Sequence, residues 1–452
     1  MLLLEQEIDL PARKDSRRLL EHFRRGAAEL LPEGLVPVRF VVTASETSGH
    51  HCEVGAISGL AEVGRSAPPS VFEFTRRTVE NTSQFNVVLL VPTGIGAEIG
   101  GHAGDAAPVA RVLAAGCDTL ITHPNVVNAS DINEIPGNGL YVEGSVICRL
   151  LMGTLGLERV RSNRVLVVID AHEDEFFVNA AVNSVNAARA SYGLRCPKII
   201  ELDPPVKLRA RYASSGAAAG RIEAFDGLCA GLDEHREQYD AVALSSVIDV
   251  PHEYHMEYFR SEGKMINPWG GVEAMLTHAI SSLYNVPSAH APMLESREIA
   301  NMDPGIVDPR MAAEAVSTTF LQCTLKGLQR SPRIVTGHDA IQRPNVITAE
   351  DVSCLVIPDG CLGLPTLACL EQGMPVIAVR ENRNVMRNDL TALPWAPGQL
   401  HVVENYWEAA GIIAALRAGI TPESVRRPFP AAIAEKKSLR PGITASRAYT
   451  MP

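Results

Sequence analysis

From Phe85 onward the chain alternates apolar, strand-like runs with helix-like segments, and this alternation restricts the fold more than any other feature. The strand-like runs, such as RVLVVIDA from Arg164 and DAVALSSVID from Asp240, are almost continuously apolar and rich in β-branched residues. Parallel strands that are buried on both faces have this composition, and helices connect one such strand to the next. The pattern therefore predicts an α/β protein with parallel, Rossmann-like sheets, arranged as two lobes around a cleft.

The first 75 residues have a different pattern, in which one helix-like segment at 13–31 is followed by short strand-like runs. Farther along the chain, 216–237 and 310–329 are also predicted to be helical. The length of 452 residues is enough for two or three domains. We therefore divide the chain into a small α+β unit (1–75), an α/β domain with a Gly-rich loop (80–330), a second α/β lobe (331–427) and an irregular tail (428–452).

The composition excludes several classes of partner. Lys and Arg number 41 against 52 Asp and Glu, a net charge of −11, whereas binding to a nucleic-acid backbone needs basic stripes. The N-terminal residues lack the basic and apolar stretches of a signal peptide, and no apolar run reaches the roughly 18 residues of a membrane span. Nine cysteines without a C-x-x-C pair are typical of a reduced protein. We expect a cytoplasmic protein that binds neither nucleic acid nor membrane, and we leave open a homo-oligomer.

The segment PTGIGAEIGGHAGDA (92–106) is the most distinctive motif. Its glycines let the backbone approach a ligand closely, and the helix expected after it offers free N–H groups to an anion. The spacing matches neither the dinucleotide fingerprint nor a P-loop, and a tight strand-to-helix crossover is the alternative. Six residues of this loop are candidate ligand contacts, namely Thr93, Gly94, Gly96, Gly101, His102 and Asp105.

Asp249, His252 and His255 form the densest titratable cluster of the α/β region. On a helix the two histidines would lie about one turn apart and could bind one divalent metal such as zinc. Proton transfer would need only one imidazole oriented by a carboxylate. A polar loop with solvated histidines is the alternative. Further ligands or catalytic groups are expected from three other histidines, namely His123, His172 and His290.

The segment RENRNVMRND (380–389) concentrates arginine and asparagine directly after a predicted strand. Guanidinium groups offer a fork geometry to a carboxylate or a phosphate, so the segment predicts an anion site. Pairing of the arginines with Asp or Glu at a domain seam is the alternative. Ligand contacts are expected from Arg380, Asn382, Arg383 and Arg387, and from Asn125 and Asn128 near another strand end.

These motifs are expected to converge, because ligands of parallel α/β sheets bind beyond the carboxyl ends of the strands. The prediction fails if Arg383 and the Gly-rich loop open onto opposite surfaces. The shared cleft should be lined by Gly96, His102, His123, Asp249 and Arg383.

A further polar segment, Thr47 to Glu53, brings hydroxyl, imidazole, thiol and carboxylate groups together. A Cys–His nucleophile requires contact between the two side chains. Neighbouring residues of a strand point to opposite faces, so His51 and Cys52 are badly placed for each other. The pattern therefore disfavours catalysis here.

Several of these segments together resemble a bacterial protein family that is known only as a domain of unknown function. The resemblance rests on PTGIGAEIGGHAGDA, ITHPNVVN, LYVEG, NPWGGVEAMLTH and IPDGCLGLPTLACLEQGMPVIAVRENRNVMRNDL, and it covers about 85–427. It implies no activity and no catalytic roles. A weaker likeness, at Gly100-Gly101-His102 and at Glu371 to Pro375, is to glycosyltransferases of the two-Rossmann-domain type, and it extends to the fold alone.

Three functions remain open. The first is a cytoplasmic enzyme that acts on a small anionic metabolite, with hydrolysis of a polar C–N bond, metal-assisted or by acid–base catalysis, as the leading reaction. The second is a nucleotide-sugar transferase or epimerase that holds phosphates in the Gly-rich loop. The third is a non-catalytic protein that closes on a small ligand.

Overall fold

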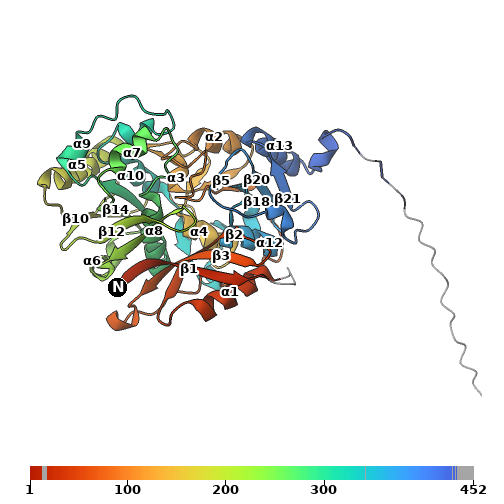
Figure 1. The fold of residues 1–452 in the computed structure, drawn as a ribbon, viewed down its shortest axis with the longest axis horizontal. Helices are drawn as coiled ribbons and strands as arrows, with labels where there is room; N and C mark the ends of the chain where they lie inside the picture. Colours follow the sequence, from red (N-terminus) through yellow and green to blue (C-terminus); the bar gives the residue numbers. More distant parts are fainter. Residues whose placement is uncertain (13–17, 342, 430, 433, 435–452) are drawn as a thin grey trace, which may run out of the picture.

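The computed structural model contains two large β-sheets with helices packed on them, which confirms the predicted α/β class. In Figure 1, β10, β12 and β14 lie on the left, β5, β18, β20 and β21 lie on the right, and β1–β3 run below. The structure describes residues 1–12, 18–341, 343–429, 431, 432 and 434.

One sheet has six strands, and all of its pairings are parallel. Its inner strands are fully buried, as expected for strands with helices on both faces. Across the sheet the strands are β21 (Leu400–Val403), β20 (Val376–Val379), β18 (Val352–Pro358), β4 (Asn86–Leu89), β5 (Thr119–Thr122) and β8 (Gly139–Tyr141). The helices that follow them along the chain are α2 (Ala107–Ala115), α4 (Gly144–Leu151), α12 (Leu364–Gln372) and α13 (Tyr406–Arg417).

The other sheet has ten strands and is mixed. Its β10, β11, β12, β14 and β15 are joined by parallel pairings, whereas every pairing from β12 through β13 and β1 to β19 is antiparallel. Parallel pairing throughout is therefore not found, and two Rossmann-like lobes stay a prediction. The strands outside the first 75 residues are β10 (Val165–Asp170), β11 (Lys198–Leu202), β12 (Lys207–Tyr212), β13 (Ala218–Glu223), β14 (Ala241–Asp249), β15 (Ser288–Met293) and β19 (Leu362–Gly363).

The hairpin of β12 and β13 replaces the first part of the helix predicted at 216–237. Gly216 has a φ of 88° in the connecting turn, and α6 (Phe225–Glu234) begins only after the hairpin. The small residues of β13 let α8 (Gly270–Tyr284) lie close, because a Cβ added to Gly220 would come within 2.5 Å of the Cβ of Val272. The prediction was wrong here because small residues that serve close packing in a strand also favour a helix.

The N-terminal residues join the ten-stranded sheet. β1 (Leu2–Pro11) pairs with β13 on one side and with β3 (Gly49–Ser58) on the other, and β2 (Val36–Ser45) pairs with β3 and β19. The predicted unit 1–75 therefore shares its sheet with later strands, although the domain boundary itself stays a prediction. The helix predicted at 13–31 is α1 (Leu19–Leu30), and residues 13–17 lie outside the described part of the chain.

Two hydrophobic cores hold these layers together. One contains Phe23 and Phe40 of the N-terminal segment together with Val88 and Leu355 of the six-stranded sheet. The other is formed by the ten-stranded sheet with α6 and α8. Because β19 follows β18 directly along the chain, the two sheets are also joined through the backbone.

The helix predicted at 310–329 is shorter than expected, since α10 begins at Leu321 and Ala312–Ala315 form only a 3₁₀ turn. The predicted tail, 428–452, lies mostly outside the described residues. No helix in the described part of the chain is long and apolar enough to span a bilayer. The remaining elements are α3 (Pro124–Val127), α5 (Glu175–Tyr192), α7 (Tyr254–Arg260), α9 (Arg297–Ala300), α10 (Leu321–Arg330), α11 (His338–Ile341), β6 (Asn128–Ala129), β7 (Ile132–Asn133), β9 (Gly156–Glu158), β16 (Arg333–Val335) and β17 (Val346–Ile347).

Candidate functional site

A cavity of about 390 Å³, which we call the main cavity, lies where strands of both sheets end. His123 directly follows β5, Ile248 lies near the end of β14, and Met293 is the last residue of β15. Side chains of α8 and α10 complete the wall. The position agrees with the rule that ligands of α/β proteins bind beyond the carboxyl ends of parallel strands.

The wall of the main cavity is rich in histidine and glutamate, and among the described residues it contains no lysine or arginine. Its apolar part includes Phe259, Trp269 and Phe320. Such a wall suits proton transfer or a neutral or cationic group, and it offers no guanidinium or ammonium group to an anion. The titratable residues are His123, His255, His278, His290, Glu143, Glu273, Glu295 and Glu314.

His290 is held at both ring nitrogens. Its Nδ1 lies 3.0 Å from Oε1 of Glu273, and its Nε2 lies 2.7 Å from Oγ of Ser246. Because a carboxylate only accepts, Nδ1 carries the proton and Nε2 accepts from the hydroxyl of Ser246. The arrangement is that of a Ser–His–acid triad, but Ser246 is buried within β14 and is absent from the cavity wall. The geometry therefore orients an imidazole at the wall and places no nucleophilic serine there.

His278 and Glu143 form a second imidazole–carboxylate pair. Nδ1 of His278 lies 2.5 Å from Oε1 of Glu143, although the ring is turned away from a linear hydrogen bond. Glu143 also caps α4 by accepting from the backbone N–H of Ser145. Burial raises the pKa of Glu143, but His278 and the hydrogen bonds from Ser145 outweigh burial, and the net pKa is lowered. A carboxylate is thus kept ionised in a buried position.

His123 and Glu314 are two further titratable groups of the wall. The backbone N–H of Val91 donates to Nε2 of His123 at 3.1 Å, and burial lowers the pKa of His123 to about 4, so this imidazole is neutral at pH 7. Glu314 accepts from the backbone N–H of Ala103 at 2.6 Å, and burial raises its pKa to about 7. A carboxyl group that titrates near neutral pH can act as a proton donor.

The structure places Asp249, His252 and His255 in different surroundings, although the ring centroids of His252 and His255 lie 6.4 Å apart. α7 begins at Tyr254, so His252 lies in the preceding turn, exposed and 4.0 Å from a glutamate of α9. Asp249 is exposed as well and pairs with Arg209 at 3.4 Å. Only His255 reaches the main cavity, where it packs against Trp269. Among the described residues no group of three or more His, Cys, Asp or Glu side chains could hold a metal ion, so the zinc site stays a prediction.

The Gly-rich loop uses its polar groups internally. Asp105 accepts from the backbone N–H of Gly100, and His102 pairs with the hydroxyl of Tyr258 at 2.6 Å. A Cβ on Gly101 would lie 2.1 Å from a backbone oxygen of the same loop, which shows why this glycine is required. These contacts favour the tight crossover that was the alternative to a ligand loop. Of the predicted contacts in the loop, Thr93 lines the main cavity, whereas Gly94, Gly96, Gly101, His102 and Asp105 do not.

The arginine segment lies away from the main cavity. Arg380 pairs with Glu404 at 2.7 Å, and Arg383 lies 3.9 Å from Glu98 of the Gly-rich loop. Asn382 is buried, and its amide bonds to the backbone of Ile99 and to the hydroxyl of Tyr406. These pairings correspond to the structural alternative for this segment. Arg387 is likewise absent from the cavity wall, whereas the predicted Asn125 and Asn128 are part of it.

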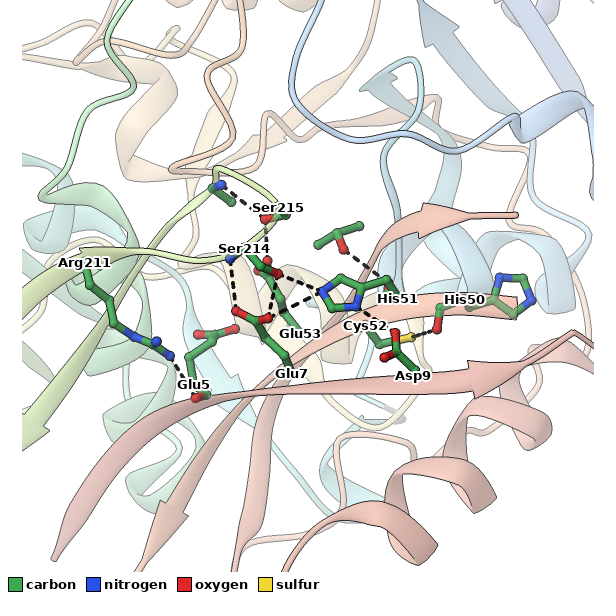
Figure 2. Close-up of polar contacts among 12 residues, drawn as sticks. Glu5, Glu7, Asp9, His50, His51, Cys52, Glu53, Arg211, Ser214 and Ser215 are labelled. Atoms are coloured by element: carbon green, nitrogen blue, oxygen red, sulfur yellow. Dashed lines mark hydrogen bonds and ion pairs between the residues drawn. The ribbon is translucent and has the colours of Figure 1, made fainter. Parts of the chain in front are cut away.

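Figure 2 shows the segment from His50 to Glu53 on β3. Nδ1 of His51 lies 2.8 Å from Oδ1 of Asp9, and its Nε2 lies 3.2 Å from Oγ of Ser214. Cys52 is buried in the hydrophobic core, which raises the pKa of its thiol to about 12. The two side chains therefore have separate surroundings, as the alternation of a strand requires.

Sequence reasoning missed Glu143, Glu273 and Glu314 as site residues. Glu143 and Glu273 lie within LYVEG and NPWGGVEAMLTH, two of the segments that carried the family resemblance. Their histidine partners are far away in the chain or on another element, so neither pair forms a local motif. Only the joint presence of Glu273 and His278 in one distinctive segment could have drawn attention to α8.

The arrangement defines an α/β protein with an acid–base cavity between two sheets. Residues 86–426 match the model of a family described as "Protein of unknown function (DUF3326)", and the chain belongs to this family. The resemblance expected from the motifs is thus confirmed. The chain is also 34% identical over 341 residues, 75% of its length, to an uncharacterized lipoprotein of Synechococcus sp., 92% of which is covered. No solved structure matches the chain.

Proposed function

We propose that the protein is an enzyme that transforms a small molecule in the main cavity by acid–base catalysis. The observation that carries this proposal is the position of His290, which is fixed between Glu273 and Ser246 at the cavity wall. An imidazole that is oriented by a carboxylate on one nitrogen can accept and return a proton at the other, which in His290 is Nε2, once the hydroxyl of Ser246 turns away from it. Burying polar groups costs free energy, so a histidine held in one orientation by buried polar partners is an expensive choice for a residue that serves packing alone.

Hydrolysis of a polar C–N bond is the reaction class that these groups serve best. It requires a base that activates water and an acid that protonates the leaving nitrogen. His290 would be the base. Glu314, whose pKa is raised to about 7 by burial, would be the acid. His278 and Glu143 would orient the polar part of the substrate.

The other hypotheses find less support in the cavity wall. A nucleotide-sugar enzyme needs groups that neutralise phosphates, and the described wall lacks lysine and arginine. Metal assistance would need ligands beyond those that the described residues bring together. A non-catalytic ligand-binding protein remains the second candidate, because large apolar side chains such as Phe259, Trp269 and Phe320 line the cavity.

We keep the cytoplasm as the proposed location, because all nine cysteines are free thiols, as is typical of a reducing compartment. The name of the Synechococcus relative raises membrane attachment as the alternative. Fractionation of cells that produce the full chain would separate the two.

The test of the proposed function is turnover of a metabolite extract, followed by mass spectrometry. The wild-type protein should consume at least one small molecule. The variants Glu273→Gln and His290→Gln should do so at least about 100-fold more slowly, because general acid–base catalysis contributes roughly 10²–10⁴-fold. Glu298→Gln, whose side chain is exposed, is the matched control and should keep the wild-type rate.

If Glu273→Gln and His290→Gln turned over substrate as fast as the control Glu298→Gln, the catalytic roles assigned to Glu273 and His290 would be overturned. Binding of small molecules without turnover by the wild-type protein would instead establish the non-catalytic alternative.

A further inference from the structure

A second cavity of about 140 Å³, which we call the side cavity, adjoins the main cavity. The two share wall residues, so the cavities lie directly beside each other. The shared residues are Thr93, His123, Gly144, Ala274 and His278. His278 therefore stands at the junction, and its partner Glu143 lies on the side of the main cavity.

The charges of the two cavities are segregated. The side cavity contains Arg39 and Arg149, and the described part of its wall contains no Asp or Glu. The main cavity has the opposite composition, with four glutamates. A ligand that spans both would meet positive charge at one end and carboxylates at the other.

The two arginines differ in their partners. Arg39 hydrogen-bonds Glu5 and lies 3.8 Å from Glu53, so its charge is compensated. Arg149 donates to the backbone oxygen of Ser281 at 3.3 Å and to Oδ1 of Asn285 at 2.8 Å. Within the described residues no carboxylate lies within 4 Å of its guanidinium group. Glu143 and Glu73 act on its charge from farther away, so Arg149 keeps donor capacity for a ligand without a direct carboxylate partner.

Ser282 gives an independent indication of a ligand. The residue is 6% exposed, it lines the side cavity, and its Oγ has no hydrogen-bond partner among the described residues. A buried hydroxyl without a partner costs about 1–3 kcal/mol, and a bound acceptor would remove that cost. Most of the remaining wall is apolar, including Phe40, Leu90 and Ile357.

We propose that the side cavity binds the carboxylate end of a short organic acid, with Arg149 and Ser282 as its donors. The apolar wall would hold a hydrocarbon body, and the far end would reach His278 at the junction. The glutamates beyond favour a neutral or cationic nitrogen group at that end. The assignment of the nitrogen group rests on the proposed function, because it makes the nitrogen end of the ligand the site of reaction. The binding of the carboxylate end does not depend on the proposed function.

A carboxylate fits this site better than a phosphate does. One guanidinium fork can bind a carboxylate through two parallel hydrogen bonds and match its single charge. A phosphate dianion in a mostly apolar pocket would leave charge uncompensated.

The test is calorimetric titration of the full chain with hexanoate, hexylamine and 1-hexanol, probes of equal length that differ in their end group. Hexanoate should bind at least tenfold more tightly than the other two. Arg149→Gln should weaken hexanoate at least tenfold and leave 1-hexanol unchanged, and Ser282→Ala should weaken hexanoate several-fold. Arg417→Gln, which removes an exposed arginine, is the control.

Equal affinity of the wild-type protein for hexanoate and 1-hexanol would overturn the proposal, and this comparison does not depend on the folding of any variant. If inorganic phosphate displaced hexanoate, the proposal that the side cavity prefers a carboxylate to a phosphate would be overturned. If hexanoate binds as expected while no metabolite is turned over, the carboxylate site stands and the proposed function fails.

Discussion

Asp170 ends β10 with its carboxyl group buried, and its Oδ2 has no hydrogen-bond partner in the described part of the chain. Burial raises its pKa to about 7, against a backbone hydrogen bond from Val206 that lowers it. A buried acid with a raised pKa makes the free energy of unfolding depend on pH. Between the unfolded pKa, near 4, and the folded pKa, the folded state binds the extra proton, so stability falls as pH rises through this window.

We predict that Asp170→Asn stabilises the protein at pH 8 by about 2 kcal/mol, because the variant stays neutral when the native carboxyl must ionise. The gain should be small near pH 4, where the carboxyl group is protonated in the folded state and only about half ionised in the unfolded state. Urea unfolding at the two pH values measures it. Glu234→Gln on α6 removes an exposed carboxyl group and should show no such gain. A gain for Asp170→Asn that is equal at both pH values would contradict the assignment.

Whether a site residue could be predicted from the sequence depended on how far away its partner lies in the chain. His123, His255, Thr93, Asn125 and Asn128 were predicted from their positions after strands, and all five reach the main cavity. The pairs with Glu143 and Glu273 could not be predicted, because each joins separate elements. The carboxylate partners of the arginine segment, Glu98 and Glu404, also lie outside it, so which acids it pairs with could not be predicted either.

At the scale of elements, α8 carries groups of both cavities. Glu273 faces the main cavity, Ser282 faces the side cavity, and His278 stands between them. The helix lies unusually close to β13, because a Cβ added to Gly271 would come within 2.1 Å of the backbone oxygen of Ala218. The position of both sites therefore depends on this contact.

We predict that Gly271→Ala forces α8 away from β13, lowers the free energy of unfolding by about 1–3 kcal/mol and weakens hexanoate binding. Gly227→Ala is the matched control, because a Cβ on this helical glycine of α6 meets nothing within 4 Å. It should be neutral or stabilising by about 0.5–1 kcal/mol. Urea unfolding measures both variants, and equal effects would show that the close approach is unimportant.

The order of strands and helices after Phe85 was largely predictable, since buried parallel strands have a strong apolar signature. The hairpin of β12 and β13 was not, because its residues are small and carry no alternation. β1 was missed although its apolar and acidic residues alternate in LLLEQEIDL, because that segment was judged only as a candidate leader. Pairing of this strand with β13 joins segments more than 200 residues apart, which no local pattern indicates.

At the scale of the whole molecule, the N-terminal strands belong to both hydrophobic cores. Leu3 and Ile57 lie in the core with α6 and α8, whereas Phe40 and Val54 lie in the core with the six-stranded sheet. Removing these strands would expose two apolar surfaces and an edge of β13. The chain should therefore unfold as one unit.

We predict that a chain lacking residues 1–58 is insoluble or unfolds without cooperativity, whereas the full chain unfolds in a single transition. Circular dichroism and tryptophan fluorescence during urea unfolding measure this, and the two transitions of the full chain should coincide. A truncated chain that is soluble and keeps the wild-type midpoint would establish the N-terminal unit as the separate domain that the sequence pattern predicts.

One wall of the side cavity consists of Val38, Arg39, Phe40 and Val41 of β2, and these residues precede the segment that matches the family. The imidazoles and carboxylates of the main cavity all fall within that segment. The groups proposed to transfer protons therefore lie inside the family segment, whereas part of the wall proposed to bind the ligand lies before it. If both proposals hold, we expect members of the family to share a type of reaction and to differ in the ligand that they select.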